Sequence, residues 1–261
     1  MFFMSIRFGV CTTFDKIPAL IDAGYDYVEF GFGNLVKMTE EEFAEAKATV
    51  EKYNFKAEAY NGFFPGEIRI TGPDVDYDQI TAHTEKGMAR AAQLGGKVTV
   101  VGSGKSRNVP DGFSFDEAYA QFAKVLGIVG DVAAKYGITV VVEPLQTKET
   151  NLINTVAEGI EIVKKVGKPN VKCLADFYHV YRNGETLDAI KNSNGWLGHL
   201  HLARANDDRA MPYEEDIPTV KEWAKAVKEC GYDGRLSLEG GYKPEFDECI
   251  IRTREILKAF E

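Results

Sequence analysis

The chain has 261 residues, of which 44% are hydrophobic, 11% aromatic and 27% charged. These fractions are typical of a soluble globular protein and exclude a collagen-like chain, a disordered tail and a membrane bundle. Forty acidic residues against 31 basic ones give a formal net charge of -9, and because such a surface repels phosphates it disfavours a nucleic-acid partner.

One unit recurs along the chain: a short β-branched or apolar run is followed by a longer segment with helical periodicity. In chain order, the predicted strands cover residues 6–10, 27–30, 56–60, 97–101, 138–143, 171–176, 197–202 and 235–239. The predicted helices cover residues 14–23, 40–53, 77–94, 115–136, 155–166, 185–192, 219–230 and 245–260. Strand and helix therefore alternate eight times.

The ends of these helices carry the expected signals. Thr39 with Glu42 and Ser114 with Glu117 fit capping boxes, and glycines follow several of the helical runs. The strands have little polar interruption, which suits a parallel sheet that is buried on both faces. With no linker or change of composition, we expect an α/β fold, a single (β/α)8 TIM barrel over residues 1–261. A doubly wound open sheet is the alternative.

The cysteines and the apolar runs indicate the compartment. Four cysteines lie far apart without a CxxC pair, which predicts reduced, structural thiols in a cytosolic protein. The first ten residues lack a basic region ahead of an apolar stretch, so we find no signal peptide there. The longest apolar runs are far shorter than the roughly 20 residues of a bilayer span. We expect a cytoplasmic protein with no membrane segment.

Four consecutive predicted strands end in residues that bind metals. In a (β/α)8 barrel the active site lies at the carboxyl ends of the strands, where this chain has Glu143, Asp176, His201 and Glu239. Carboxylates so close together repel unless a cation holds them. Oxygen ligands with one nitrogen suit one divalent ion, with Mn²⁺ as first candidate and Mg²⁺, Co²⁺ or Zn²⁺ as alternatives. Three carboxylates and one divalent ion would give the site a net charge near -1, which suits a neutral polyol as the substrate.

At this point the sequence resembles a known family. The phrases VVVEPLQTKETNLINT, LADFYHVYR, GHLHLARANDDRAMP and RLSLEGG are similar to the xylose-isomerase-like barrel superfamily. The branch is that of sugar and sugar-phosphate isomerases and epimerases, which includes the D-tagatose and D-psicose 3-epimerases. The resemblance spans the chain, is strongest over residues 138–242, and implies that Glu143, Asp176, His201 and Glu239 are the metal ligands.

The resemblance also implies substrate contacts. Glu149, six residues after the first ligand, and His179, three after the second, match residues that contact the substrate near its carbonyl end. The family has an arginine shortly after the ligand histidine. Arg209 is our candidate rather than Arg204, because it precedes a proline as in the family.

The activity that the resemblance implies is C3 epimerisation of a free ketose through a cis-enediolate. Glu143 and Glu239 would be the catalytic pair on opposite faces of the sugar. Aldose–ketose isomerisation stays open, as do a hydroxypyruvate or inosose isomerase or dehydratase and a carbohydrate-processing subunit that needs a partner chain. Four histidines and a negative charge disfavour the superfamily's three-zinc endonucleases of abasic DNA. A homodimer or homotetramer is a further expectation from the resemblance.

For other polar residues the sequence gives less specific predictions. His199 lies two residues before His201 on the same predicted strand, so both side chains point into the barrel. Because His199 lies one layer deeper, we expect it to be a hydrogen-bonded core residue. Glu29, Glu58 and Asn61 sit on the second and third strands, where they would line the pocket. His83, on a predicted helix, is expected at the surface.

The loops after the third and fourth predicted strands contain further candidate residues. GSGKS at residues 102–106 resembles a phosphate loop, but Thr99 stands where the first glycine belongs, and we expect no helix directly after it. Lys105 and Arg107 remain candidates for binding a phosphate or the distal hydroxyls of the substrate. Phe63 and Phe64 predict an exposed apolar loop at the barrel mouth. The loops after strands seven and eight hold no glycine-rich phosphate cup, which favours a free sugar.

Overall fold

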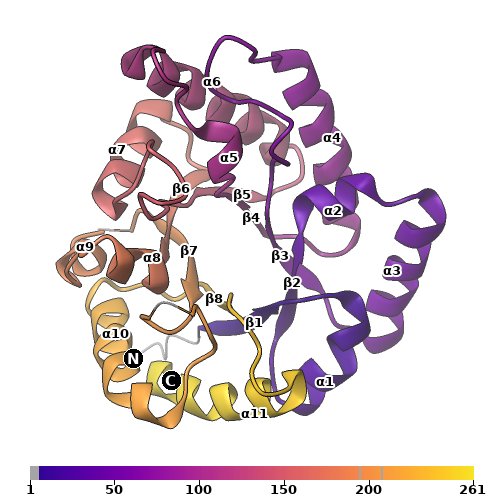
Figure 1. Ribbon diagram of the computed structural model, residues 1–261. Coiled ribbons are helices and arrows are strands. Elements are labelled where there is room, and N and C mark those ends of the chain that lie inside the picture. Colours follow the sequence, from indigo (N-terminus) through magenta and orange to yellow (C-terminus); the bar gives the residue numbers. More distant parts are fainter. Residues whose placement is uncertain (1–5, 194, 207) are drawn as a thin grey trace.

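The computed structural model describes residues 6–193, 195–206 and 208–261. Eight parallel strands close into a barrel in sequence order, with β1 pairing β8 (Figure 1). The strands are β1 (Arg7–Cys11), β2 (Tyr27–Gly31), β3 (Ala57–Asn61), β4 (Val98–Val101), β5 (Thr139–Val142), β6 (Val171–Asp176), β7 (Leu197–Leu202) and β8 (Arg235–Leu238). The prediction of a (β/α)8 TIM barrel is confirmed.

Helices surround the barrel (Figure 1). The α-helices are α1 (Ile17–Asp22), α2 (Phe32–Lys37), α3 (Glu40–Tyr53), α4 (Tyr77–Gln93), α5 (Gly104–Arg107), α6 (Phe115–Ala134), α7 (Val156–Val166), α8 (Phe177–Arg182), α9 (Asp188–Lys191), α10 (Ile217–Glu229) and α11 (Phe246–Leu257). Three short 3₁₀ segments, η1 (Phe14–Lys16), η2 (Glu214–Asp216) and η3 (Lys258–Phe260), adjoin α1, α10 and α11. Among the described residues no helix is long and apolar enough to cross a membrane. Residues 1–5, the start of the stretch in which we find no signal peptide, lie outside the described part.

Every predicted strand is present, and no strand end differs from its prediction by more than one residue. All eight predicted helices are found as well, although the helix expected over residues 185–192 is limited to the four residues of α9. Helices α2, α5 and α8 were not predicted, because helices of four to six residues are too short to show a helical period. The expectation of no helix directly after GSGKS was therefore wrong, since α5 starts within that segment.

The capping signals explain where two long helices begin. Thr39 accepts a hydrogen bond from the backbone of Glu42, whose carboxylate accepts from the Thr39 backbone in return, so the predicted box is complete. At Ser114 only the first half of the box is present: its hydroxyl accepts from the backbone of Glu117 at 3.3 Å. Both caps set the helix start where the sequence predicts it.

The barrel interior is filled, so only its mouth is free for chemistry. Its inner core consists of Tyr27, Ala59, Val98, Val100, Val141 and Leu174. The Tyr27 ring crosses above Gly9, where a Cβ would lie 2.2 Å from a ring atom. A larger apolar core packs the helices onto the outside of the strands. All four cysteines are free thiols.

The loop after β3 differs from its prediction. Phe63 and Phe64 are buried rather than exposed, with 0% and 4% of their surfaces accessible. Phe63 stacks on Phe32 of the unpredicted α2, with ring centroids 4.0 Å apart. His83, expected at the surface, packs edge-on against Phe63, and its Nε2 lies 2.8 Å from the Phe63 carbonyl oxygen. Because α2 covers this loop, the phenylalanines belong to the core and form no exposed wall at the mouth.

Candidate metal and substrate site

Four side chains from neighbouring strands converge at the carboxyl end of the barrel. Asp176 ends β6, His201 lies in β7, and Glu143 and Glu239 directly follow β5 and β8. The register pairs Asp176 with His201, so these two side chains start side by side. One ligand atom from each of the four residues lies within 4.8 Å of the others. This is the set that the sequence analysis proposed as metal ligands.

The donor atoms of this cluster fit a divalent cation. Among the described residues, Glu143 Oε1 and His201 Nδ1 are buried and have no hydrogen-bond partner. His201 Nδ1 lies 3.0 Å from Glu239 Oε2 and 3.5 Å from Glu143 Oε1. Leaving such atoms unsatisfied costs roughly 1–3 kcal/mol each. Three carboxylates and one imidazole nitrogen that face one point would be satisfied by Mn²⁺, Mg²⁺, Co²⁺ or Zn²⁺.

Local structure orients the three carboxylate ligands. Asp176 caps α8, because its Oδ1 accepts a hydrogen bond from the backbone of Tyr178 at 2.8 Å, which leaves Oδ2 for the cluster. Asn61 at the end of β3 donates to Glu239 Oε1 at 2.7 Å. Gly102 makes room for Glu143, since a Cβ there would lie 2.2 Å from Glu143 Oε2. The protein itself thus positions the three carboxylates of the cluster.

Without a metal, the ionisable groups of the cluster have strongly shifted pKa values. Burial, followed by the nearby Glu239 carboxylate, raises the pKa of Glu143. Burial would also raise the pKa of Glu239, but His201 and Arg209 outweigh it and lower that pKa to about 2. Burial would lower the pKa of His201, but Glu29 and Glu239 raise it well above its ordinary value. The cluster therefore favours positive charge at its centre.

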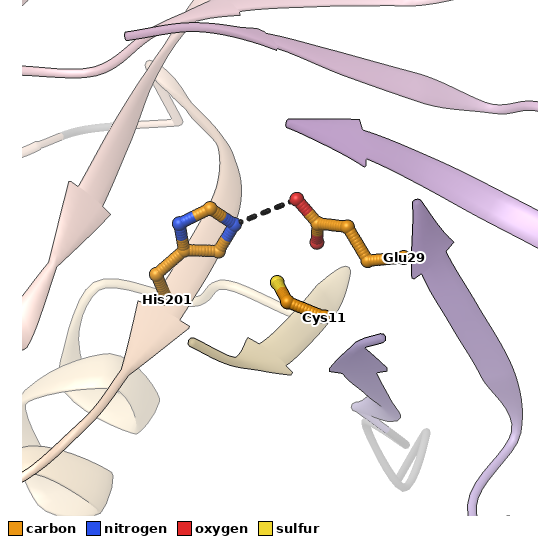
Figure 2. Close-up of side chains that lie close together, drawn as sticks. All are labelled: Cys11, Glu29 and His201. Atoms are coloured by element: carbon orange, nitrogen blue, oxygen red, sulfur yellow. Dashed lines mark hydrogen bonds and ion pairs between the residues drawn. The ribbon is translucent and has the colours of Figure 1, made fainter. Parts of the chain in front are cut away.

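A second layer of polar residues lies below His201. The His201 Nε2 donates to Glu29 Oε1 at 3.0 Å (Figure 2). His199 Nε2 donates to Glu29 Oε2 at 2.9 Å. Glu29, His199 and His201 are all fully buried. His199 is the hydrogen-bonded core residue that its parity predicts. Glu29, however, does not line the pocket: it lies beneath the ligand layer.

His179 points into the cluster from α8. The backbone N–H of Gln146 donates to His179 Nδ1 at 3.2 Å, so a neutral His179 carries its proton on Nε2. That nitrogen is buried without a hydrogen bond, 3.6 Å from Asp176 Oδ2 and 3.9 Å from Glu143 Oε1. Gln146 also donates from its side chain to Glu149 Oε1 at 2.7 Å. Gln146 was not predicted as a site residue, because a glutamine in a loop carries no sequence signal of its own.

Arg209 is the arginine that reaches the cluster. Its Nη2 donates to Asp176 Oδ2 at 2.6 Å and to Glu239 Oε2 at 2.5 Å, and its guanidinium lies over the Tyr178 ring. Arg204, which the sequence analysis set aside, pairs with acidic residues of η2 instead. The structure therefore brings Arg209, rather than Arg204, to the carboxylates.

Two further expectations for the rim were wrong. Glu58 lies at the opposite end of the barrel, where it pairs with Arg7 and Arg235, the first residues of β1 and β8. Arg107 is fully buried and donates to main-chain carbonyls, including that of Glu143 at 2.8 Å, so it cannot bind a phosphate at the mouth. Of the two candidates Lys105 and Arg107, Lys105 is the exposed one.

Comparisons with known proteins agree with this fold. A family model described as "Xylose isomerase-like TIM barrel" matches residues 17–259. A D-psicose 3-epimerase of Agrobacterium fabrum is 33% identical over 122 residues, which cover 46% of this chain and 41% of that protein. A 3-dehydro-D-guloside 4-epimerase of Escherichia coli is 27% identical over 238 residues, covering 86% of this chain and 88% of that protein.

The chain thus aligns with about two fifths of the length of the D-psicose 3-epimerase and with most of the guloside epimerase. Among solved structures, a D-psicose 3-epimerase crystallised in the presence of D-fructose superposes with a TM-score of 0.83 at 18% identity. That superposition covers 97% of both chains, and at this identity it shows a shared fold.

Proposed function

The chain belongs to the xylose isomerase-like TIM barrel family, and from this premise we propose that it is a divalent-metal-dependent sugar isomerase or epimerase. Its specific reaction, in this proposal, is C3 epimerisation of a free ketose. One observation carries the proposal: Glu143, Asp176, His201 and Glu239 converge within 4.8 Å at the barrel mouth, with buried donor atoms left unpaired.

Those four side chains would hold one divalent ion, with Mn²⁺ as the preferred metal. Such an ion, when bound, polarises the carbonyl of a ketose and so acidifies the neighbouring C–H bond. The protein supplies the ligands in a preorganised form, because Asp176 is fixed as a helix cap and Glu239 is held by Asn61.

Glu143 and Glu239 are the proposed catalytic pair. They follow β5 and β8, which are separated in the barrel by β6 and β7, so they approach a bound sugar from different sides. One carboxylate would remove the proton from C3, and the other would return a proton to the opposite face of the planar enediolate. Because the reaction is reversible, the two roles exchange with direction.

His179, Glu149 and Arg209 are the proposed substrate-binding residues. The unpaired Nε2–H of His179 is a donor for a sugar oxygen, and Arg209 adds a cation beside Asp176. Arg107 and Arg204 are engaged with carbonyls and carboxylates. Their engagement supports an uncharged sugar over a sugar phosphate.

The proposal treats residues 1–261 as one barrel domain of a cytoplasmic homodimer or homotetramer. Aldose–ketose isomerisation, and the isomerisation or dehydration of hydroxypyruvate or inosose, are alternatives that use the same metal cluster. They differ from epimerisation in the carbon that exchanges its proton.

The test measures proton exchange at carbon. Mn²⁺-loaded protein is incubated in D2O with free ketoses, ketose phosphates, hydroxypyruvate and inosose, and deuterium incorporation is read by NMR. We expect deuterium at C3 of a free ketose and an epimeric product, with neither in a Glu143→Gln variant. Exchange confined to C1 would favour aldose–ketose isomerisation. Absence of both exchange and conversion across the panel would refute the proposed activity.

A further inference from the structure

A fully buried carboxylate lies directly beneath the proposed metal ligands. Figure 2 shows Glu29 on β2 pointing across the barrel toward His201 on β7, with the Cys11 thiol beside them. Glu29 is 0% exposed, as is His201. Such a charge is expensive to bury unless hydrogen bonds satisfy it, so its presence calls for a specific role.

Both oxygens of Glu29 are engaged. Oε1 accepts from His201 at 3.0 Å and Oε2 accepts from His199 at 2.9 Å. The Ser237 hydroxyl lies 3.3 Å from His199 Nε2, and the Tyr27 hydroxyl lies 2.8 Å from Ser237. The carboxylate is therefore held by two buried histidines, one of which contacts Ser237 in the barrel interior.

This anchoring determines which nitrogen of His201 faces the metal ligands. A carboxylate accepts but does not donate, so Nε2 of His201 must carry the proton. A neutral His201 then has its lone pair on Nδ1, the nitrogen 3.0 Å from Glu239 Oε2. Metal-binding histidines commonly donate their outer N–H to a carboxylate, which fixes the ring and raises its basicity.

We propose that Glu29 is a positioning residue for metal binding, which holds His201 so that Nδ1 presents its lone pair to the divalent ion. The role rests on the proposed function, because it assumes that His201 is a ligand. Glu29 itself touches neither the ion nor the substrate.

A competing interpretation is a second metal site. Ligand atoms of Cys11, Glu29 and His201 also lie within 4.8 Å of one another, a set that suits Zn²⁺. That site would require Glu29 to give up a hydrogen bond and His201 to lose its Nε2 proton. The hydrogen bonds therefore favour a positioning role, and the stoichiometry of metal binding tests the choice.

The first measurement is Mn²⁺ affinity by calorimetry. Glu29→Gln keeps the shape of the side chain but gives it an amide N–H₂ that opposes one imidazole N–H. We expect its dissociation constant to rise roughly 10- to 100-fold. The matched control is Glu58→Gln, another buried strand glutamate, which pairs with Arg7 and Arg235 at the far end of the barrel. Its affinity should stay within about 2-fold of wild type, since it lies outside the site.

The second measurement is the visible spectrum of the Co²⁺-loaded proteins, with circular dichroism as the check on folding. A reoriented His201 should shift the Co²⁺ bands in Glu29→Gln and leave them unchanged in Glu58→Gln. A folded Glu29→Gln protein with wild-type affinity and spectrum would overturn the inference. So would a second Zn²⁺ equivalent that Cys11→Ser removes, because Glu29 would then be a ligand itself.

The proposed function and the positioning role of Glu29 would be refuted by different results. If wild-type protein binds no divalent ion, the proposed function fails and the metal role of Glu29 fails with it. If wild type binds Mn²⁺ and His201→Ala abolishes that binding, an unchanged Glu29→Gln refutes the positioning role alone.

Discussion

Replacing Arg107 by methionine tests how the loop after β4 supports the site. The guanidinium donates to the carbonyls of Glu143 at 2.8 Å and Ile153 at 3.1 Å, with a longer bond of 3.4 Å to Val101. Hydrogen bonds from a charged donor contribute roughly 1.5–3 kcal/mol each, so losing the two shorter bonds costs about 3–6 kcal/mol. Methionine fills part of the space beside Phe122, so we expect a net loss near the lower bound, about 3 kcal/mol.

The assay is thermal and urea denaturation followed by circular dichroism. A loss of about 3 kcal/mol corresponds to a fall in Tm of roughly 6–12 °C for a domain of this size. The control is Lys105→Met, because Lys105 lies in the same helix α5 and is exposed. An Arg107→Met protein as stable as Lys105→Met would refute the structural role of this arginine. Phosphate-dependent stabilisation that Arg107→Met removes would instead restore the phosphate-binding interpretation.

Three further predictions concern the site and its surroundings. Glu143→Gln and Glu239→Gln should each lower kcat roughly 10²- to 10⁴-fold with an unchanged circular dichroism spectrum, and wild-type turnover in both would contradict the catalytic pair. His179→Ala should raise KM while metal analysis still finds a bound ion, so a metal-free variant would contradict a substrate role. Burial raises the pKa of half-buried Glu185 from 4.5 to about 7 in the folded protein, so the folded state binds the extra proton and stability falls as pH rises from about 4.5 to 7. Glu185→Gln should flatten that fall in Tm measured from pH 4.5 to pH 8, and an identical pH profile would count against the shifted pKa.

Much of the fold and the cluster at the mouth could be predicted from local pattern. The strands are apolar runs bounded by turn residues, and their ends were located to within one residue. Since carboxyl ends of barrel strands meet at one face, the last residues of β5 to β8 define which side chains come together. Glu143, Asp176, His201 and Glu239 were identified in this way, and the structure places their ligand atoms within 4.8 Å.

The same reasoning failed where a residue's partner is remote in the chain. Glu58 and Asn61 both lie on β3, yet Glu58 pairs at one end of the barrel and Asn61 holds Glu239 at the other. Arg107 looked like a rim cation, but it is buried against carbonyls of later loops. Short helices such as α2 and α8 carry too few turns to show a period, although α2 decides that Phe63 is buried.

By itself the sequence determined the α/β barrel and the residues at its strand ends, because hydrophobic periodicity, caps and turn residues act within a few positions of one another. Only the tertiary structure decided the second layer: that Gln146 holds His179, and that Glu29 holds His201 from 172 residues away. Those pairings depend on barrel closure and strand register, which bring remote side chains into contact, and no local pattern records them.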